Sequence, residues 1–129
     1  MAIVHLDTHV VARLYAGLDN KIARAARTLM ARADQLVVSQ FVVLELDDMI
    51  DLRRIRNVSV DRLIDQLSSQ FPMATSSAPL ADVIANARRI EWTKDPMDRL
   101  IVANAMADGA RLITADEKIR AHFKDAVWD

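Results

Sequence analysis

Two acidic residues directly follow short apolar runs that the sequence predicts to be β-strands. Asp7 comes after the run 3–6, and Asp116 lies two residues beyond the run 111–114. Parallel sheets bind ligands at the carboxyl ends of their strands, so catalytic carboxylates are expected at these positions. Each residue taken alone also fits an ordinary role, a turn or capping position for Asp7 and a helix-stabilising acid in a first turn for Asp116.

Two further acids lie on the apolar faces of predicted helices. Glu45 comes three residues after Val42, which places both on one helical face, and Asp98 shares a face with Ile101. An ionised carboxylate on an apolar face is costly unless a cation or a metal ion compensates it. The alternatives are a buried pair with an arginine for Glu45 and, for Asp98, a capping-box-like role beside the expected N-cap Asp95.

The four carboxylates together predict a metal site made of oxygen ligands. If the side chains converge, their mutual repulsion raises some of their pKa values and destabilises the fold, and a divalent cation relieves this. The chain has no cysteine, and its three histidines lack metal-ligand spacing, so Mg²⁺ or Mn²⁺ is favoured over zinc. His5 alternates with apolar residues in the first predicted strand and is interpreted as a structural histidine.

The elements that must position these acids alternate between strand and helix along the chain. This order predicts a parallel sheet with helices on both faces. Thr8 is a candidate cap of the first helix, and Gly109 is expected at the end of the helix that carries Asp98. The expected strands are 3–6, 36–38, 71–74, 111–114 and 126–128. The expected helices are 10–17, 21–33, 40–51, 60–69, 80–90, 95–108 and 116–123.

Length and composition set the class of protein. The 129 residues fit one domain, 1–129, and 52% of them are apolar, enough for an aliphatic core. The net charge of −1 argues against a protein that coats nucleic acids through bulk positive charge, but not against a local basic patch. No run is long and apolar enough for a membrane span, and no signal peptide is recognised, so a cytoplasmic protein is expected.

Four segments of the chain resemble the signature blocks of PIN domains, above all those of VapC-type toxins from toxin–antitoxin pairs. The blocks occur in the family's order and spacing, and together they reach from the first strand almost to the last residue. They are LDTHVVARLYAG (6–17), SQFVVLEL (39–46), DPMDRLIVANA (95–105) and LITADEKIR (112–120).

The resemblance implies a three-layer α/β/α fold with a central parallel sheet and an endoribonuclease that depends on Mg²⁺ or Mn²⁺. It implies that the chain pairs with an antitoxin protein, which lays an apolar segment across grooves of the toxin, and that the chain forms a homodimer. Its acidic positions fall on Asp7, Glu45, Asp98 and Asp116, with Asp95, Thr114 and Thr8 as supporting residues.

The implied reaction is attack of a metal-bound water on an RNA phosphodiester, which requires no nucleophilic side chain. Arg13, Lys94 and Arg99 flank the acids and are candidate phosphate contacts, with surface salt bridges as the alternative for each. The basic cluster 53–56 either steers RNA or solvates a helix end.

Other readings fit the sequence less well. A phosphoacceptor receiver domain needs an aspartate where the second strand ends, and this chain has Ser39 there. A haloacid-dehalogenase-type phosphatase begins with Asp-x-Asp, and here His9 follows Asp7 at the second position. A housekeeping RNA-processing nuclease and a non-catalytic PIN-like binding module both remain open, although four retained acids count against the second.

Overall fold

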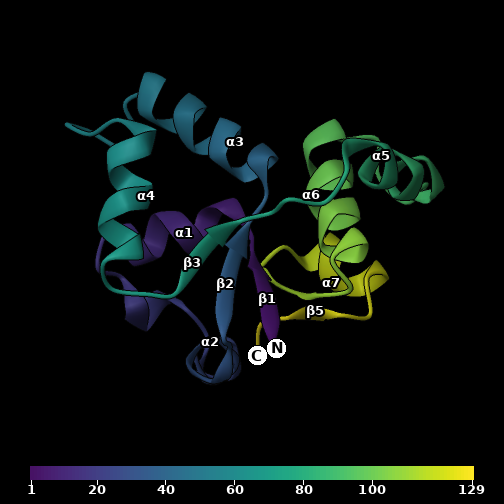
Figure 1. Cartoon of the computed structure of the whole chain (residues 1–129), viewed down its shortest axis with the longest axis horizontal. Helices are drawn as coiled ribbons and strands as arrows, with labels where there is room; N and C mark the ends of the chain where they lie inside the picture. Colours follow the sequence, from purple (N-terminus) through teal and green to yellow (C-terminus); the bar gives the residue numbers. More distant parts are fainter.

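The computed structural model describes all residues from 1 to 129. Its centre is a sheet of five parallel strands in the order β3-β2-β1-β4-β5 (Figure 1). The strands are β1 (Ile3–Leu6), β2 (Gln35–Val38), β3 (Met73–Thr75), β4 (Arg111–Ile113) and β5 (Ala126–Val127). β3 and β5 are the outer strands of the sheet.

Helices cover both faces of this sheet, which confirms the predicted three-layer fold. Helices α1, α3 and α4 contact one another on one side, and α5 packs against α6 on the other (Figure 1). None of the helices could cross a membrane. The helices are α1 (Thr8–Tyr15), α2 (Arg24–Arg32), α3 (Gln40–Asp51), α4 (Val60–Ser68), α5 (Leu80–Arg89), α6 (Pro96–Ala107) and α7 (Glu117–His122).

Side-chain caps fix where the helices of the site begin. Ser39, Asp95 and Asp116 each accept hydrogen bonds from backbone N–H groups in the first turn of α3, α6 and α7. Asp7 caps α1 by accepting from the Thr8 backbone N–H, so the expectation that Thr8 would be the cap was wrong and the helix starts two residues earlier than predicted. These caps fix the amino ends of the helices near the carboxyl ends of the strands.

The predicted helix over 21–33 is interrupted. A 3₁₀ turn, Asp19–Lys21, precedes α2, which starts only at Arg24. The Leu18 N-cap of the turn and the Ala23 N-cap of α2 offer no side-chain hydrogen bond, and the chain is extended at Ile22 and Ala23. Ile22 is buried, so packing of this side chain sets the break.

The alternation of β1 separates the apolar core from a polar one. Val4 and Leu6 are buried in the hydrophobic core, whereas His5 alternates with them and its Nε2 lies 2.7 Å from Asp108 Oδ2. Asp108 also accepts a 2.7 Å hydrogen bond from the Ser76 hydroxyl, to which Asn104 donates at 2.8 Å. The interpretation of His5 as a structural histidine is confirmed.

Candidate metal-dependent active site

The four predicted acids lie at the end of the sheet where the parallel strands terminate. Asp7 follows β1, and Asp116 follows β4, the strand that pairs with β1. Glu45 is in the second turn of α3, and Asp98 is in the first turn of α6. Helices α3 and α6 contact each other, so acids from four separate segments face one region.

Asp7 is the most rigidly held of these acids. Its side chain is 9% exposed. Oδ1 accepts a 2.8 Å hydrogen bond from the Thr8 backbone N–H, and Oδ2 accepts a 2.6 Å bond from the Thr114 hydroxyl. The same hydroxyl accepts a 3.0 Å bond from the Asp116 backbone N–H. Thr114 therefore ties the loop that carries Asp116 to the Asp7 carboxylate.

The charges of the acids act on one another most strongly at Asp98. Burial, as the largest cause, and the negative charges of Asp95, Asp116, Asp7 and Glu45 together raise the pKa of Asp98 to about 6. No arginine or lysine lies within ion-pair distance of Asp98. Asp98 therefore has four carboxylates around it and no basic side chain to offset their charge. This arrangement marks a pocket of concentrated negative charge.

Glu45 faces the same pocket. Burial raises the pKa of Glu45, and Asp7, Asp95 and Asp48 add to the rise, while the Thr8 hydroxyl nearby lowers it. The Thr8 hydroxyl is itself buried and has no hydrogen-bond partner of good geometry. The alternative of an arginine partner for Glu45 is wrong, because no ion pair joins them.

The donor set fits a hard divalent cation in chemistry, but the side chains are not drawn together into a ligand sphere. Nowhere do three or more histidine, aspartate or glutamate side chains lie close enough together to hold a metal ion. The oxygen-only donors and the concentrated negative charge suit a hard divalent cation.

His9 is a residue of this site that the sequence did not reveal. Its Nε2 accepts a 2.8 Å hydrogen bond from the Ala115 backbone N–H, so Nδ1 carries the proton and lies 3.7 Å from Asp7 Oδ2. The ring also makes an edge contact with Trp128, at 6.0 Å between centroids. Burial lowers the pKa of His9, against the opposing effect of Asp7. His9 lacks the spacing of a metal ligand, and its contact with a backbone N–H distant in the chain leaves no signal in the sequence.

The three basic residues predicted to contact RNA differ in their surroundings. Arg13 lies over the Trp128 ring at 5.5 Å and donates to the Lys21 carbonyl. Lys94 is exposed just before the α6 cap. The Arg99 guanidinium donates two hydrogen bonds to the Ala87 carbonyl of α5, at 3.2 and 2.9 Å, and so links α5 to α6.

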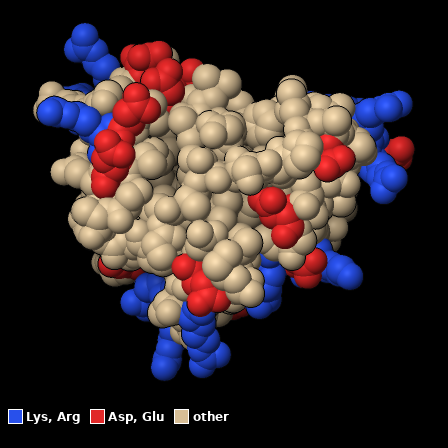
Figure 2. All heavy atoms as spheres, in the orientation of Figure 1, with Lys and Arg blue, Asp and Glu red and all other residues tan.

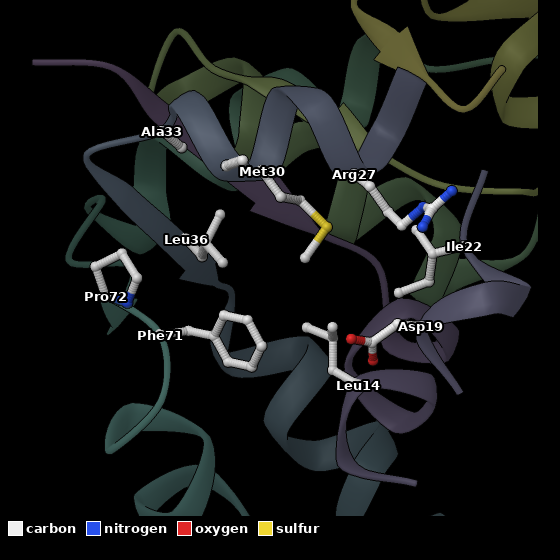
Figure 3. A pocket seen from close by; sticks show the side chains of 10 residues that line it. Leu14, Asp19, Ile22, Arg27, Met30, Ala33, Leu36, Phe71 and Pro72 are labelled. Carbon is white, nitrogen blue, oxygen red and sulfur yellow. The ribbon is translucent and has the colours of Figure 1, made fainter. Parts of the chain in front are cut away.

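An apolar cavity of about 290 Å³ lies away from these acids, beside the start of β2. Leu14, Met30 and Phe71 point into it, and Asp19 and Arg27 lie on the same side of it as Ile22 (Figure 3). The acids lie where the strands end, whereas this cavity lies where β2 and β3 begin, so it is not part of the carboxylate pocket.

Comparison with known proteins agrees with this architecture. Residues 4–124 match the model of the PIN domain family. The chain is 31% identical over 123 residues to Ribonuclease VapC22 of Mycobacterium tuberculosis, covering 95% of this chain and 93% of that protein.

Solved structures share the fold. A toxin–antitoxin complex from Klebsiella pneumoniae superimposes with a TM-score of 0.67 at 20% identity, covering 96% of this chain and 95% of that one. VapBC2 from Rickettsia felis, bound to a DNA fragment from its promoter, gives a TM-score of 0.64 at 17% identity, covering 98% and 99%. With the family match spanning nearly the whole sequence, the chain belongs to the PIN domain family.

Proposed function

We propose that the protein is a metal-dependent endoribonuclease in which Asp7, Glu45, Asp98 and Asp116 hold one or two Mg²⁺ or Mn²⁺ ions. The observation that carries the proposal is the negative charge concentrated at Asp98, whose pKa is raised to about 6 by burial and by four surrounding carboxylates. Membership of the PIN family and the 31% identity to a protein named as a ribonuclease support the choice of reaction.

Each residue has a part in this reaction. A divalent ion held there would supply a water of lowered pKa and neutralise charge on the phosphate. Asp7 is fixed before any ion binds, because the Thr8 backbone and the Thr114 hydroxyl orient both of its oxygens. Glu45 and Asp98 would bind the cation in their ionised forms, so their raised pKa values make cation binding depend on pH. Asp95 caps α6 and adds negative charge as an outer-sphere residue.

Cleavage of a labelled structured RNA tests the proposal. The wild-type protein should cut with Mg²⁺ or Mn²⁺ and stop with chelator, and Asp98→Asn or Glu45→Gln should reduce the rate by at least 100-fold. Asp82→Asn is the matched control, because Asp82 is the same third residue of its helix, α5, but is exposed and outside the pocket. Full activity in Asp98→Asn, or activity that survives chelation, would refute the assignment.

We also propose that the cognate partner is an antitoxin that covers the apolar cavity with an apolar segment. The cavity has seven apolar lining residues among ten, with Leu14, Ile22 and Met30 inside the alanine- and leucine-rich stretch from 12 to 33. The structural neighbour from Klebsiella is a toxin–antitoxin complex. Ala31→Trp would fill the exposed rim of the cavity, and it should weaken binding of the small protein encoded by a neighbouring gene while leaving RNA cleavage intact. Unchanged binding would move the partner elsewhere on the surface.

The cytoplasmic location and the homodimer complete the proposal. The homodimer is what the resemblance to VapC-type toxins implies, and the cytoplasmic location is the expectation from the sequence. Fractionation of cells that express a tagged chain and sedimentation of the purified protein test them separately.

A further inference from the structure

An open hollow of about 660 Å³ lies between α2 and the β4–β5 edge of the sheet. Arg24, Thr28 and Arg32 line it from one stripe of α2, and Arg111 lines it from the start of β4. Asp129 lies at its rim, just after β5. Lysine and arginine side chains project from the lower edge of the molecule in Figure 2, which is where α2 lies in Figure 1.

The hollow carries uncompensated positive charge. Arg24, Arg32 and Arg111 are all exposed, and no carboxylate lies within 4.0 Å of any of them. The one acid of the hollow, Asp129, is bound instead to Arg120, at 2.5 Å. Three guanidinium groups therefore face one hollow in a chain whose net charge is −1. This is a local concentration of charge rather than a general property of the surface.

The segment 127–129, at and after the end of β5, runs from this hollow toward the carboxylate pocket. Val127 and Asp129 line the hollow, while Trp128 between them contacts His9, two residues from Asp7. The Trp128 carbonyl also accepts a 3.0 Å hydrogen bond from the Ala26 backbone N–H in the first turn of α2. Trp128 therefore lies between His9, beside the carboxylate pocket, and the Arg24 end of the hollow.

The spacing of the arginines selects the kind of anion. Arg24 and Arg32 are eight residues apart on one helix, about 12 Å along its axis. One phosphate or carboxylate cannot reach both, whereas a chain of phosphates can. Guanidinium groups bind phosphate through two parallel hydrogen bonds, which suits a flexible polyanion.

We propose that this hollow, the arginine hollow lined by Arg24, Arg32 and Arg111, binds phosphates of the RNA substrate several nucleotides away from the bond that is cut. The proposal rests on the proposed ribonuclease function and extends it with a second, separate contact surface. It gives the enzyme a grip on RNA that does not depend on the metal or on the four carboxylates.

Binding of a labelled 12-nucleotide single-stranded RNA, followed by fluorescence anisotropy in chelator, tests this without cleavage. R24Q/R32Q/R111Q should weaken binding at least 10-fold at low salt. The slope of log K against log salt should become less negative by about 2, because each lost phosphate contact removes roughly 0.7. R62Q/R88Q/R89Q is the matched control, since it removes the same charge from exposed positions on α4 and α5.

The outcomes separate this proposal from the proposed function. If the wild type cuts RNA with metal and R24Q/R32Q/R111Q binds RNA as tightly as the wild type, the proposed role of the arginine hollow is refuted and the nuclease assignment stands. Equal losses in both triple variants would also overturn it, because they would reflect net charge alone. If poly-L-glutamate displaces the labelled RNA as effectively as unlabelled RNA does, the hollow is a site for an acidic protein segment and the RNA proposal is refuted. A wild type that neither binds nor cuts RNA would refute the ribonuclease itself. Thermal midpoints within a few degrees of wild type should show that both triples fold.

Discussion

Replacing Asp98 by asparagine should make the metal-free protein more stable while it removes activity. The pKa of Asp98 rises from 3.8 to about 6 in the folded protein, so ionising this carboxyl group at neutral pH opposes folding. A rise of that size corresponds to roughly 3 kcal/mol at 1.36 kcal/mol per pKa unit. Because the side chain is only partly buried, solvent screening reduces the penalty to about 1–2 kcal/mol.

The helix dipole works against this gain. Asp98 lies in the first turn of α6, where a negative charge stabilises the helix by about 0.3–1 kcal/mol. The net gain expected for Asp98→Asn is therefore about 1 kcal/mol, or roughly 3 °C in thermal midpoint for a domain of this size. Asp82→Asn removes the same dipole interaction from α5 without the crowded acids, and it should lower the midpoint slightly.

The pH dependence gives the prediction its sign. The folded pKa lies above the unfolded one, so the folded protein binds more protons between pH 3.8 and about 6 and loses stability as the pH rises through that window. The two proteins should have equal stability near pH 4 and differ fully by pH 7. Urea unfolding in chelator at pH 4, 5.5 and 7 measures this. If Asp98→Asn is destabilised as much as Asp82→Asn at pH 7, the carboxylates do not repel one another and the predicted stabilisation is refuted.

Three further predictions concern the polar groups around and beneath the site. Burial lowers the pKa of His5 below 6.5, so below that pH the unfolded protein binds more protons than the folded one, and the free energy of unfolding should fall as the pH drops. His5→Gln should flatten the plot of unfolding free energy, measured with urea, against pH in this range. An unchanged slope of that plot would contradict this. Thr114→Val removes a buried hydroxyl that holds Asp7, and it should cost about 1–3 kcal/mol of unfolding free energy as well as activity, so a variant as stable as wild type would refute the bond. His9→Phe loses the acceptor for the Ala115 N–H and should lower kcat about 10-fold or more, whereas His9→Gln keeps an acceptor and should retain most of kcat; equal rates in the two would exclude this positioning role.

The sequence was sufficient to predict the fold because its strongest signals are local. The apolar runs, the Ser39 and Asp95 caps and Gly109 at φ 61° set the elements within a few residues of their observed ends. The alternation of strand and helix then leaves a parallel sheet as the topology, and a parallel sheet has only one edge where all strands end. Asp7 and Asp116 were placed at that edge by chain order alone.

The positions of Asp98 and Glu45 could not be predicted from the ends of the strands. Asp98 follows a loop rather than a strand, and it reaches the pocket because α6 begins at that edge. The helical faces of Val42 and Ile101 predicted that both acids point inward, but only the contact between α3 and α6 brings their charges onto the same pocket.

What the sequence by itself determined is therefore the order of the elements and the identity of the acids, since periodicity, caps and residue type act within a few residues of chain. What only the tertiary structure decided is which distant groups become neighbours: His9 against Ala115, Trp128 between His9 and the end of β5, and Arg24 with Arg111 around one hollow. These contacts depend on β4 lying beside β1 and β5 beside β4, and that order is set by the packing of whole helices on the sheet, which no local pattern encodes.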